Sequence, residues 1–223
     1  MADLEVTDVR KEFPTRSDPL VVLKDVSLKM SAGDNLAIVG PSGVGKSTLL
    51  HIIGTLDTPT SGQVRLNGQD PFALNEAELA HFRNHNIGFI FQEHHLLPQL
   101  TALENVLIPT IAEGKADQDT IERARYLLER VDLSDRLDHR PAELAGGERE
   151  RVAVARALIQ KPSLLLADEP TGNLDRRTAD EIAQLLLELQ SLEKNMLVVV
   201  THSTKMAELL QSCLSLDDGL LES

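Results

Sequence analysis

Residues 40–48 place glycines, a lysine and hydroxyl side chains at a spacing that suits phosphate chemistry. An apolar run at 36–39, typical of a buried strand, precedes them, and a second apolar run follows at 49–53. Glycines at this spacing let backbone N–H groups turn inward around phosphate oxygens, and a helix beginning near Lys46 directs its positive end at them. The pattern predicts a nucleoside triphosphate site made of Gly40, Pro41, Ser42, Gly43, Val44, Gly45, Lys46, Ser47 and Thr48.

Metal chemistry at such a loop needs charged and hydroxyl partners. Lys46 can place a full positive charge at the β- and γ-phosphates, and the Ser47 hydroxyl can ligate Mg²⁺. Asp168 and Glu169 directly follow the apolar run 164–167, and open α/β sheets bind ligands at the carboxyl ends of their strands. We therefore expect Asp168 to hold Mg²⁺ and Glu169 to act as general base on the attacking water.

A third candidate is the glycine pair in Leu-Ala-Gly-Gly-Glu at 144–148. Paired glycines that open a helix leave N–H groups free and form a second anion site. Taken alone, this stretch is more typical of an ordinary helix start, so its functional interpretation depends on the other motifs.

The whole-chain composition narrows the class of partner. The 223 residues carry a net charge of −13, which argues against nucleic acid and against adsorption to anionic lipid. No apolar run approaches the ~20 residues that span a bilayer, and no signal-peptide pattern is present, so we expect a cytoplasmic protein without direct membrane insertion. The single cysteine, Cys213, excludes an internal disulfide and is expected to be buried.

Hydrophobic periodicity predicts strands and helices that alternate around one helical insertion. We expect strands at 4–9, 26–30, 35–39, 63–66, 87–91, 163–167 and 195–201, with a terminal hairpin at 214–220. We expect helices at 75–84, 102–111, 119–131, 147–160, 177–192 and 204–211, and a loop at 16–19. The short apolar strands separated by helices favour a mostly parallel sheet that is covered on both faces.

Six motifs, in the order in which they occur along the chain, resemble those of the ATP-binding-cassette (ABC) ATPase family. The resemblance extends over residues 4 to 220. Beyond the phosphate loop and the acidic pair, 144–148 resembles the family's signature motif and 173–175 its D-loop. Gln92 matches the glutamine switch loop, His202 the switch histidine, and Phe13 the aromatic residue that stacks on adenine. The resemblance implies a P-loop NTPase (RecA-like) α/β core, about 1–92 and 161–223, with an antiparallel β subdomain and an inserted helical subdomain, about 93–160.

The resemblance also implies a mechanism that requires two chains. Each of two ATP molecules would lie between the phosphate loop of one chain and Ala145, Gly146 and Gly147 of the other, so one copy of each motif implies a homodimer. Gln92 would reach Mg²⁺ and the water and signal to an integral-membrane permease made of separate chains. His202 would contact the γ-phosphate, and Asp175 would act across the dimer interface.

Several stretches narrow the resemblance to one subgroup. Residues 91–98, 100–106 and 168–175 are similar to the ATPases of lipoprotein release, macrolide efflux and cell division. The stretches 94–98, 139–141 and 146–149 are most similar to the first of these. This implies an ATPase on the cytoplasmic face of the inner membrane that powers lipoprotein release. An efflux-type or division-type driver, a soluble cassette and a subunit that barely hydrolyses ATP are the alternatives.

Two further expectations concern single positions. The signature usually carries serine where this chain has Ala145, and the loss of one hydrogen bond to a charged group, worth about 1.5–3 kcal/mol, predicts weakened hydrolysis. His94 and His95 should point in different directions, in a loop facing the membrane partner rather than in a metal site.

Overall fold

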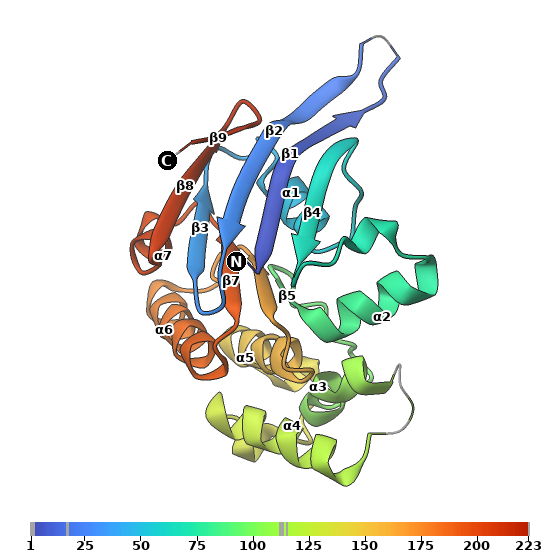
Figure 1. Cartoon of the computed structure of the whole chain (residues 1–223). Coiled ribbons are helices and arrows are strands. Elements are labelled where there is room, and N and C mark those ends of the chain that lie inside the picture. Colours follow the sequence, from blue (N-terminus) through green and yellow to red (C-terminus); the bar gives the residue numbers. More distant parts are fainter. Residues whose placement is uncertain (1–2, 17, 112–113, 115, 223) are drawn as a thin grey trace.

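The computed structural model of the chain describes residues 3–16, 18–111, 114 and 116–222, in which two sheets are stacked with helices around them (Figure 1). The smaller sheet is antiparallel, in the order β2-β1-β4, with β1 at Leu4–Phe13, β2 at Leu20–Met30 and β4 at Ser61–Leu66. The larger sheet has the order β5-β6-β7-β3-β8-β9. Its strands are β5 Ile87–Phe91, β6 Leu164–Asp168, β7 Met196–Val200, β3 Asn35–Val39, β8 Ser212–Asp217 and β9 Leu220–Glu222.

Side chains of the larger sheet alternate between two cores. β5, β6, β7, β3 and β8 are parallel, and only β9 is antiparallel to its neighbour. Along β6, Leu165 and Ala167 enter one cluster of buried residues, whereas Leu164 and Leu166 enter the other. This period of two explains why the strands have uninterrupted apolar sequences, since a sheet covered on both faces needs apolar side chains on both.

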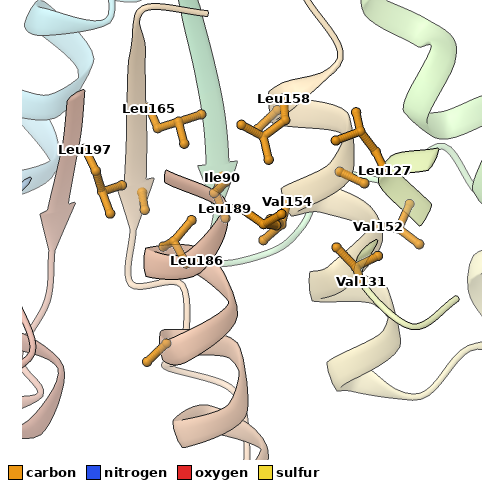
Figure 2. Packing of buried hydrophobic residues seen from close by; sticks show 14 of the residues in the cluster. Ile90, Leu127, Val131, Val152, Val154, Leu158, Leu165, Leu186, Leu189 and Leu197 are labelled. Atoms are coloured by element: carbon orange, nitrogen blue, oxygen red, sulfur yellow. The ribbon is translucent and has the colours of Figure 1, made fainter. Parts of the chain in front are cut away.

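Helices fill the space on each side of that sheet. The first cluster packs the sheet against α3 (Ala102–Ile111), α4 (Gln118–Arg130), α5 (Gly146–Leu158) and α6 (Arg176–Glu193), as Figure 2 shows for Leu165, Val154 and Leu186. The second cluster joins the sheet to α1 (Lys46–Ile53), the antiparallel sheet and Phe82 of α2 (Glu76–Asn86). The remaining elements are α7 (Thr204–Glu208) and the 3₁₀ turns Pro71–Ala73, Ser134–Arg136 and Pro141–Glu143.

The fold class expected from the sequence is confirmed, with shifts at element ends. β1 and β2 are longer than expected, because 21–23 continues the ladder of β2 and pairs with β1. α7 ends at Glu208 instead of 211, because Ser212 already begins β8. The expected loop at 16–19 includes residue 17, which lies outside the described residues. The expectation for Cys213 is wrong: its side chain is exposed on β8.

The sequence has no apolar run of bilayer-spanning length, so no helix is expected to cross a membrane. Across the described parts of the chain, every helix is too short or too polar to cross a bilayer.

Candidate nucleotide site

Strand register brings four loops to one edge of the larger sheet. Phe91, Asp168 and Val200 are paired across β5, β6 and β7, and Val200 pairs with Ile38 of β3. The residues that follow these positions therefore emerge side by side. Gln92, Glu169 and His202 thus lie at the same sheet edge as the phosphate loop that begins at Gly40.

The phosphate loop ends in the helix that the sequence predicted. α1 begins at Lys46, and its N-cap Gly45 has a φ of 111°, a value that side chains other than glycine rarely adopt. A Cβ atom at Gly45 would also lie 2.8 Å from Val22 Cγ1. Lys46 is only 8% exposed, and its ammonium donates to the carbonyl oxygens of Gly40 at 2.8 Å and Pro41 at 2.9 Å. The loop thus holds a buried cation at its centre.

A carboxylate lies beside the first turn of α1. Ser47 Oγ donates to Asp168 Oδ1 at 3.1 Å, although the two residues are 121 positions apart. Burial raises the pKa of Asp168, and the Ser47 hydrogen bond opposes that shift. A hydroxyl and a carboxylate oxygen next to a phosphate site are the hard ligands that Mg²⁺ accepts while keeping several waters. These residues therefore fit the expected metal.

Glu169 has a separate set of partners. Its φ is 49°, and its backbone N–H donates to the Val200 carbonyl at 2.9 Å, which turns the side chain toward β7. Glu169 Oε1 lies 2.9 Å from His202 Nδ1, and Oε2 accepts from Thr201 Oγ1 at 3.2 Å and from the His202 N–H at 3.3 Å. The carboxylate is thus held in one place, as a general base should be.

Gln92 is joined to the loop that follows β6. Gln92 Nε2 donates to Asn173 Oδ1 at 3.4 Å, and Asn173 Nδ2 donates to the Gln92 carbonyl at 3.2 Å. Asn173 belongs to the stretch 173–175 that resembles the D-loop, but its contact with Gln92 was not predicted, and Thr201 had no predicted role in the site. Their positions beside predicted site residues were a signal, but the pairing itself depends on strand register.

The signature stretch starts α5 as expected. Ala145 is the N-cap, and its N–H donates to Glu148 Oε2 at 2.8 Å. Alanine has no side-chain acceptor, so only this half of a capping box is formed. The N–H groups of Gly146 and Gly147 lie in the first turn, where helices leave donors without intrahelical partners.

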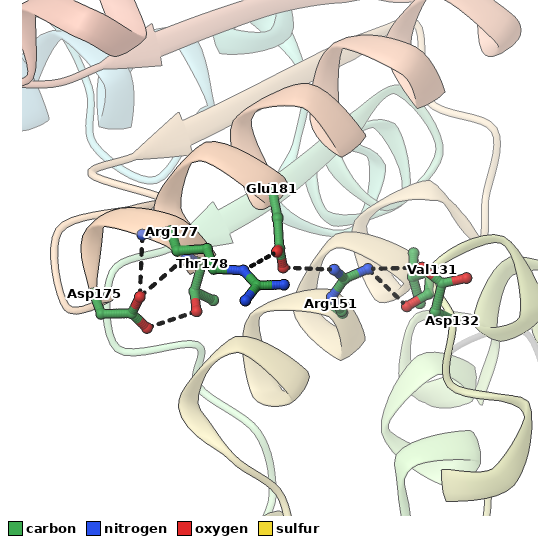
Figure 3. Close-up of polar contacts among 7 residues, drawn as sticks. All are labelled: Val131, Asp132, Arg151, Asp175, Arg177, Thr178 and Glu181. Carbon is green, nitrogen blue, oxygen red and sulfur yellow. Dashed lines mark hydrogen bonds and ion pairs between the residues drawn. The ribbon is translucent and has the colours of Figure 1, made fainter.

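Asp175 caps the next long helix. Its carboxylate accepts from the N–H groups of Arg177 at 3.1 Å and Thr178 at 3.2 Å and from the Thr178 hydroxyl at 2.6 Å (Figure 3). The Thr178 hydroxyl, followed by these N–H groups, lowers the pKa of Asp175. Asp175 therefore has a structural role at the start of α6, whatever it does at an interface.

Phe13 ends β1 and is 38% exposed, with Lys11 Nζ 4.9 Å from its ring centroid. Within the described ranges, no hydrogen bond or ion pair joins Phe13, 145–147 or Asp175 to the cluster around Asp168 and Glu169. Strand register thus brings together the phosphate loop, Gln92, Asp168, Glu169 and His202, whereas the other predicted site residues make no hydrogen bond or ion pair with this cluster among the described residues.

A family model described as "ABC transporter" matches residues 23–172. The chain belongs to the ABC transporter family. It is 56% identical over 218 residues, 98% of this chain and 95% of the relative, to "Lipoprotein-releasing system ATP-binding protein LolD 1" of Rhodopirellula baltica. A protein of Geobacter metallireducens named "Lipoprotein-releasing system ATP-binding protein LolD" is 52% identical over 97% of this chain and 96% of its own length.

A solved ATP-binding cassette, described as a dimeric post-hydrolysis state bound to ADP and Pi, has a TM-score of 0.89 and 39% identity to this chain. The alignment covers 99% of this chain and 97% of that one. The expected family is thus confirmed, and the chain is an ATP-binding, ATP-hydrolysing enzyme.

Proposed function

We propose that this chain is the ATPase subunit of a lipoprotein-releasing complex, bound peripherally to the cytoplasmic face of the inner membrane. The observation that carries hydrolysis is the position of Glu169, which three contacts from Thr201 and His202 hold at the sheet edge beside Asp168 and the phosphate loop. Lipoprotein as cargo is supported by relatives of that name, which match 97–98% of the chain.

Each residue at the sheet edge has a distinct task in this proposal. Lys46 and the N–H groups of 40–48 bind the phosphates of ATP. Ser47, Asp168 and Gln92 would hold Mg²⁺, which supplies charge neutralisation between the phosphates. Glu169 accepts the proton of the attacking water, and His202, 2.9 Å from its carboxylate, keeps Glu169 oriented and would contact the γ-phosphate.

The second half of each site comes from another copy of the chain. The N–H groups at the start of α5 suit an anion, yet among the described residues no hydrogen bond joins them to the phosphate loop of their own chain. A symmetric pair would put Gly146 and Gly147 of one copy over the phosphates bound by the other, with Phe13 against the adenine base and Asp175 near the interface. The dimeric state described for the solved cassette supports this arrangement.

A groove beside the loop after Gln92 is the proposed contact with permease chains. It has a volume of 460 Å³, and the aromatic and aliphatic residues that line it include Leu56, Phe89, Phe91 and Ile108. Because the chain carries a net charge of −13, the occupant we propose is an apolar permease segment with basic flanks. In this proposal, about 93–160 is a helical subdomain carried by a core of 1–92 and 161–223.

The decisive experiment combines purification from membranes with a trapped variant. Glu169→Gln keeps the size of the side chain but removes the base, so with ATP and Mg²⁺ it should accumulate as a dimer by light scattering, together with permease subunits of a lipoprotein system. A strictly monomeric protein, with or without membrane partners, would overturn the proposal. Co-purification with an efflux or division partner would support the alternative driver instead.

A further inference from the structure

The loop that leaves Gln92 is held in an unusual backbone conformation by α5. His94 and His95 have φ values of 58° and 48°, so two consecutive non-glycine residues are left-handed. Left-handed backbone is unfavourable for residues that carry a Cβ, so the surroundings must impose the conformation. Arg156 of α5 does so in part, because its guanidinium donates to the His94 carbonyl at 2.6 Å and to the His95 carbonyl at 2.7 Å.

A second residue of α5 contacts the loop through a side chain. Glu150 is 1% exposed, and its Oε2 lies 2.6 Å from Nδ1 of His94, which is itself only 13% exposed. Among the described residues, neither Nδ1 of His94 nor Oε1 of Glu150 has a partner in hydrogen-bond geometry. The contact is therefore a close but poorly aligned polar contact in a buried place, where small movements change its energy strongly.

The electrostatic setting of Glu150 is specific. Burial raises the pKa of Glu150, and the contact with His94 and the charge of Arg156 oppose that shift. Burial also lowers the pKa of Arg156, which the charge of Glu150 opposes. Glu150 thus lies beside both His94, which belongs to this loop, and Arg156, which donates to its carbonyl oxygens.

We propose that Glu150 is a positioning residue for ATP hydrolysis: by holding His94, it couples the position of Gln92 to the first turn of the signature helix. Gln92 is two residues before His94, and Gly147 is three residues before Glu150 on the same helix, about 4.5 Å along its axis. A displacement of either segment therefore reaches the other through one side-chain contact. This inference rests on the role proposed above for Gln92.

The groove described above borders the loop that Glu150 and Arg156 hold. His95 and Arg156 both line it, and the His95 ring stacks edge-on against Phe91 at a centroid distance of 4.9 Å. The two histidines point in different directions, as expected: His94 turns inward to Glu150 and His95 borders the groove. A segment seated in the groove would therefore touch the loop that Glu150 holds.

The first test is kinetic and uses Glu150→Gln, which keeps the shape of the side chain and removes its charge. We expect kcat for ATP hydrolysis by the full-length protein to fall about tenfold, while KM for ATP changes less than about twofold, because the phosphate loop is untouched. His94→Gln should give the same loss, and the double variant should lose no more than either single one.

The matched control is Glu188→Gln, which makes the same chemical change in an exposed pair with Arg130 at 2.8 Å. It should leave kcat unchanged. A kcat for Glu150→Gln equal to that of the control, or losses that multiply in the double variant, would overturn the inference. If Gln92→Ala also left kcat unchanged, the role of Gln92 itself would be wrong, whereas a loss there alone would refute only the role of Glu150.

The second test follows the loop directly and does not depend on turnover. The chain has no tryptophan, so Leu97→Trp, at an exposed position of this loop, gives a single fluorophore. In the Glu169→Gln background, ATP with Mg²⁺ should shift its emission, and adding His94→Gln or Glu150→Gln should reduce that shift at least about threefold. An undiminished shift in folded variants, verified by circular dichroism, would contradict the coupling.

Discussion

At the residue scale, the missing hydroxyl at Ala145 has two consequences. Ala145 is the N-cap of α5 and offers no side-chain acceptor to the first turn. Ala145→Ser should cap that turn and stabilise the fold by about 1 kcal/mol. It should also add a donor toward the γ-phosphate across the dimer, and a charged hydrogen bond of about 1.5–3 kcal/mol corresponds to roughly a tenfold or greater rise in ATPase rate.

The measurements are the ATPase rate at saturating ATP and the thermal midpoint. Ala142→Ser makes the same change at an exposed position three residues earlier and should alter neither. An Ala145→Ser protein that is more stable but no faster would show that the serine acts only as a cap. An unchanged or lower rate thus contradicts the weakened-hydrolysis hypothesis.

The buried carboxylate of Asp168, which we expect to bind the metal, should lower the stability of the folded protein at neutral pH. Because burial raises its pKa in the folded state, the folded protein binds this proton more tightly than the unfolded chain does. Its stabilising contribution is therefore present at low pH and is lost as pH rises through the raised pKa. Asp168→Asn should melt higher than the wild type at pH 7 without nucleotide, and the difference should shrink on acidification.

The same variant should lose at least ~100-fold in Mg²⁺-dependent ATPase rate, since metal stabilisation of the transition state is worth several kcal/mol. Asp138→Asn, at an exposed position, is the control for both measurements. A lower melting temperature for Asp168→Asn at pH 7 would mean that its hydrogen bond from Ser47 outweighs the cost of burial.

At the element scale, α6 depends on Asp175 for its start. The carboxylate satisfies the N–H groups of Arg177 and Thr178, which would otherwise lack acceptors in the first turn. Asp175→Ala should lower Tm by about 2–4 °C at pH 7, a typical effect for loss of a cap in a chain of this size. Asparagine also caps helices well, so Asp175→Asn should keep Tm near that of the wild type.

The contribution of this cap to stability should depend on pH. The pKa of Asp175 is lowered in the folded state, so its contribution is present above the unfolded pKa and is lost as pH falls through the lowered value. The Tm difference between wild type and Asp175→Ala should therefore disappear in strong acid. An Asp175→Asn protein with normal Tm but reduced ATPase rate would indicate an additional role at the dimer interface.

Beyond its first turn, α6 is tied to α5, the signature helix. Figure 3 shows Glu181 of α6 between Arg177 and Arg151, and Arg151 in turn donates to the carbonyl oxygen of Val131 at 3.1 Å and to Asp132 at 3.3 Å. Patterns within one element predicted each of these helices, because an apolar stripe and its caps are local. The pairing between helices was not predictable, since charged residues on exposed faces have many equivalent partners in sequence.

At the whole-molecule scale, the sequence predicted those parts of the site whose functional residues are neighbours along the chain. The loop 40–48 and the pair Asp168–Glu169 each lie at the end of one apolar strand, so residue type and spacing sufficed. The contacts of Glu169 with Thr201 and of Gln92 with Asn173 arise from the order and register of the strands, which no local pattern encodes. The inward turn of His94 depends on Glu150 in the same way.

Local sequence patterns also do not show how the signature glycines, which form the second half of the site, are brought to a phosphate loop. Within this chain, the signature glycines and the phosphate loop have no hydrogen bond to one another among the described residues. Two inactive variants can therefore test whether they cooperate between chains. Lys46→Ala removes the phosphate-binding charge, and Gly147→Asp puts a carboxylate where an anion should bind, at a position whose Cβ would already lie 2.5 Å from Thr178 Cγ2.

Each variant alone should be nearly inactive, because both sites of its homodimer lack one half. In an equimolar mixture, about half of the dimers should be mixed, and each mixed dimer joins the intact phosphate loop of the Gly147→Asp chain to the intact signature of the Lys46→Ala chain. One working site in half of the dimers predicts about a quarter of the wild-type ATPase rate. A mixture as inactive as its components would mean that both halves must come from the same chain, or that one intact site is insufficient. A mixture of Lys46→Ala with Lys46→Ala,Gly147→Asp has no intact phosphate loop and is the control that must remain inactive.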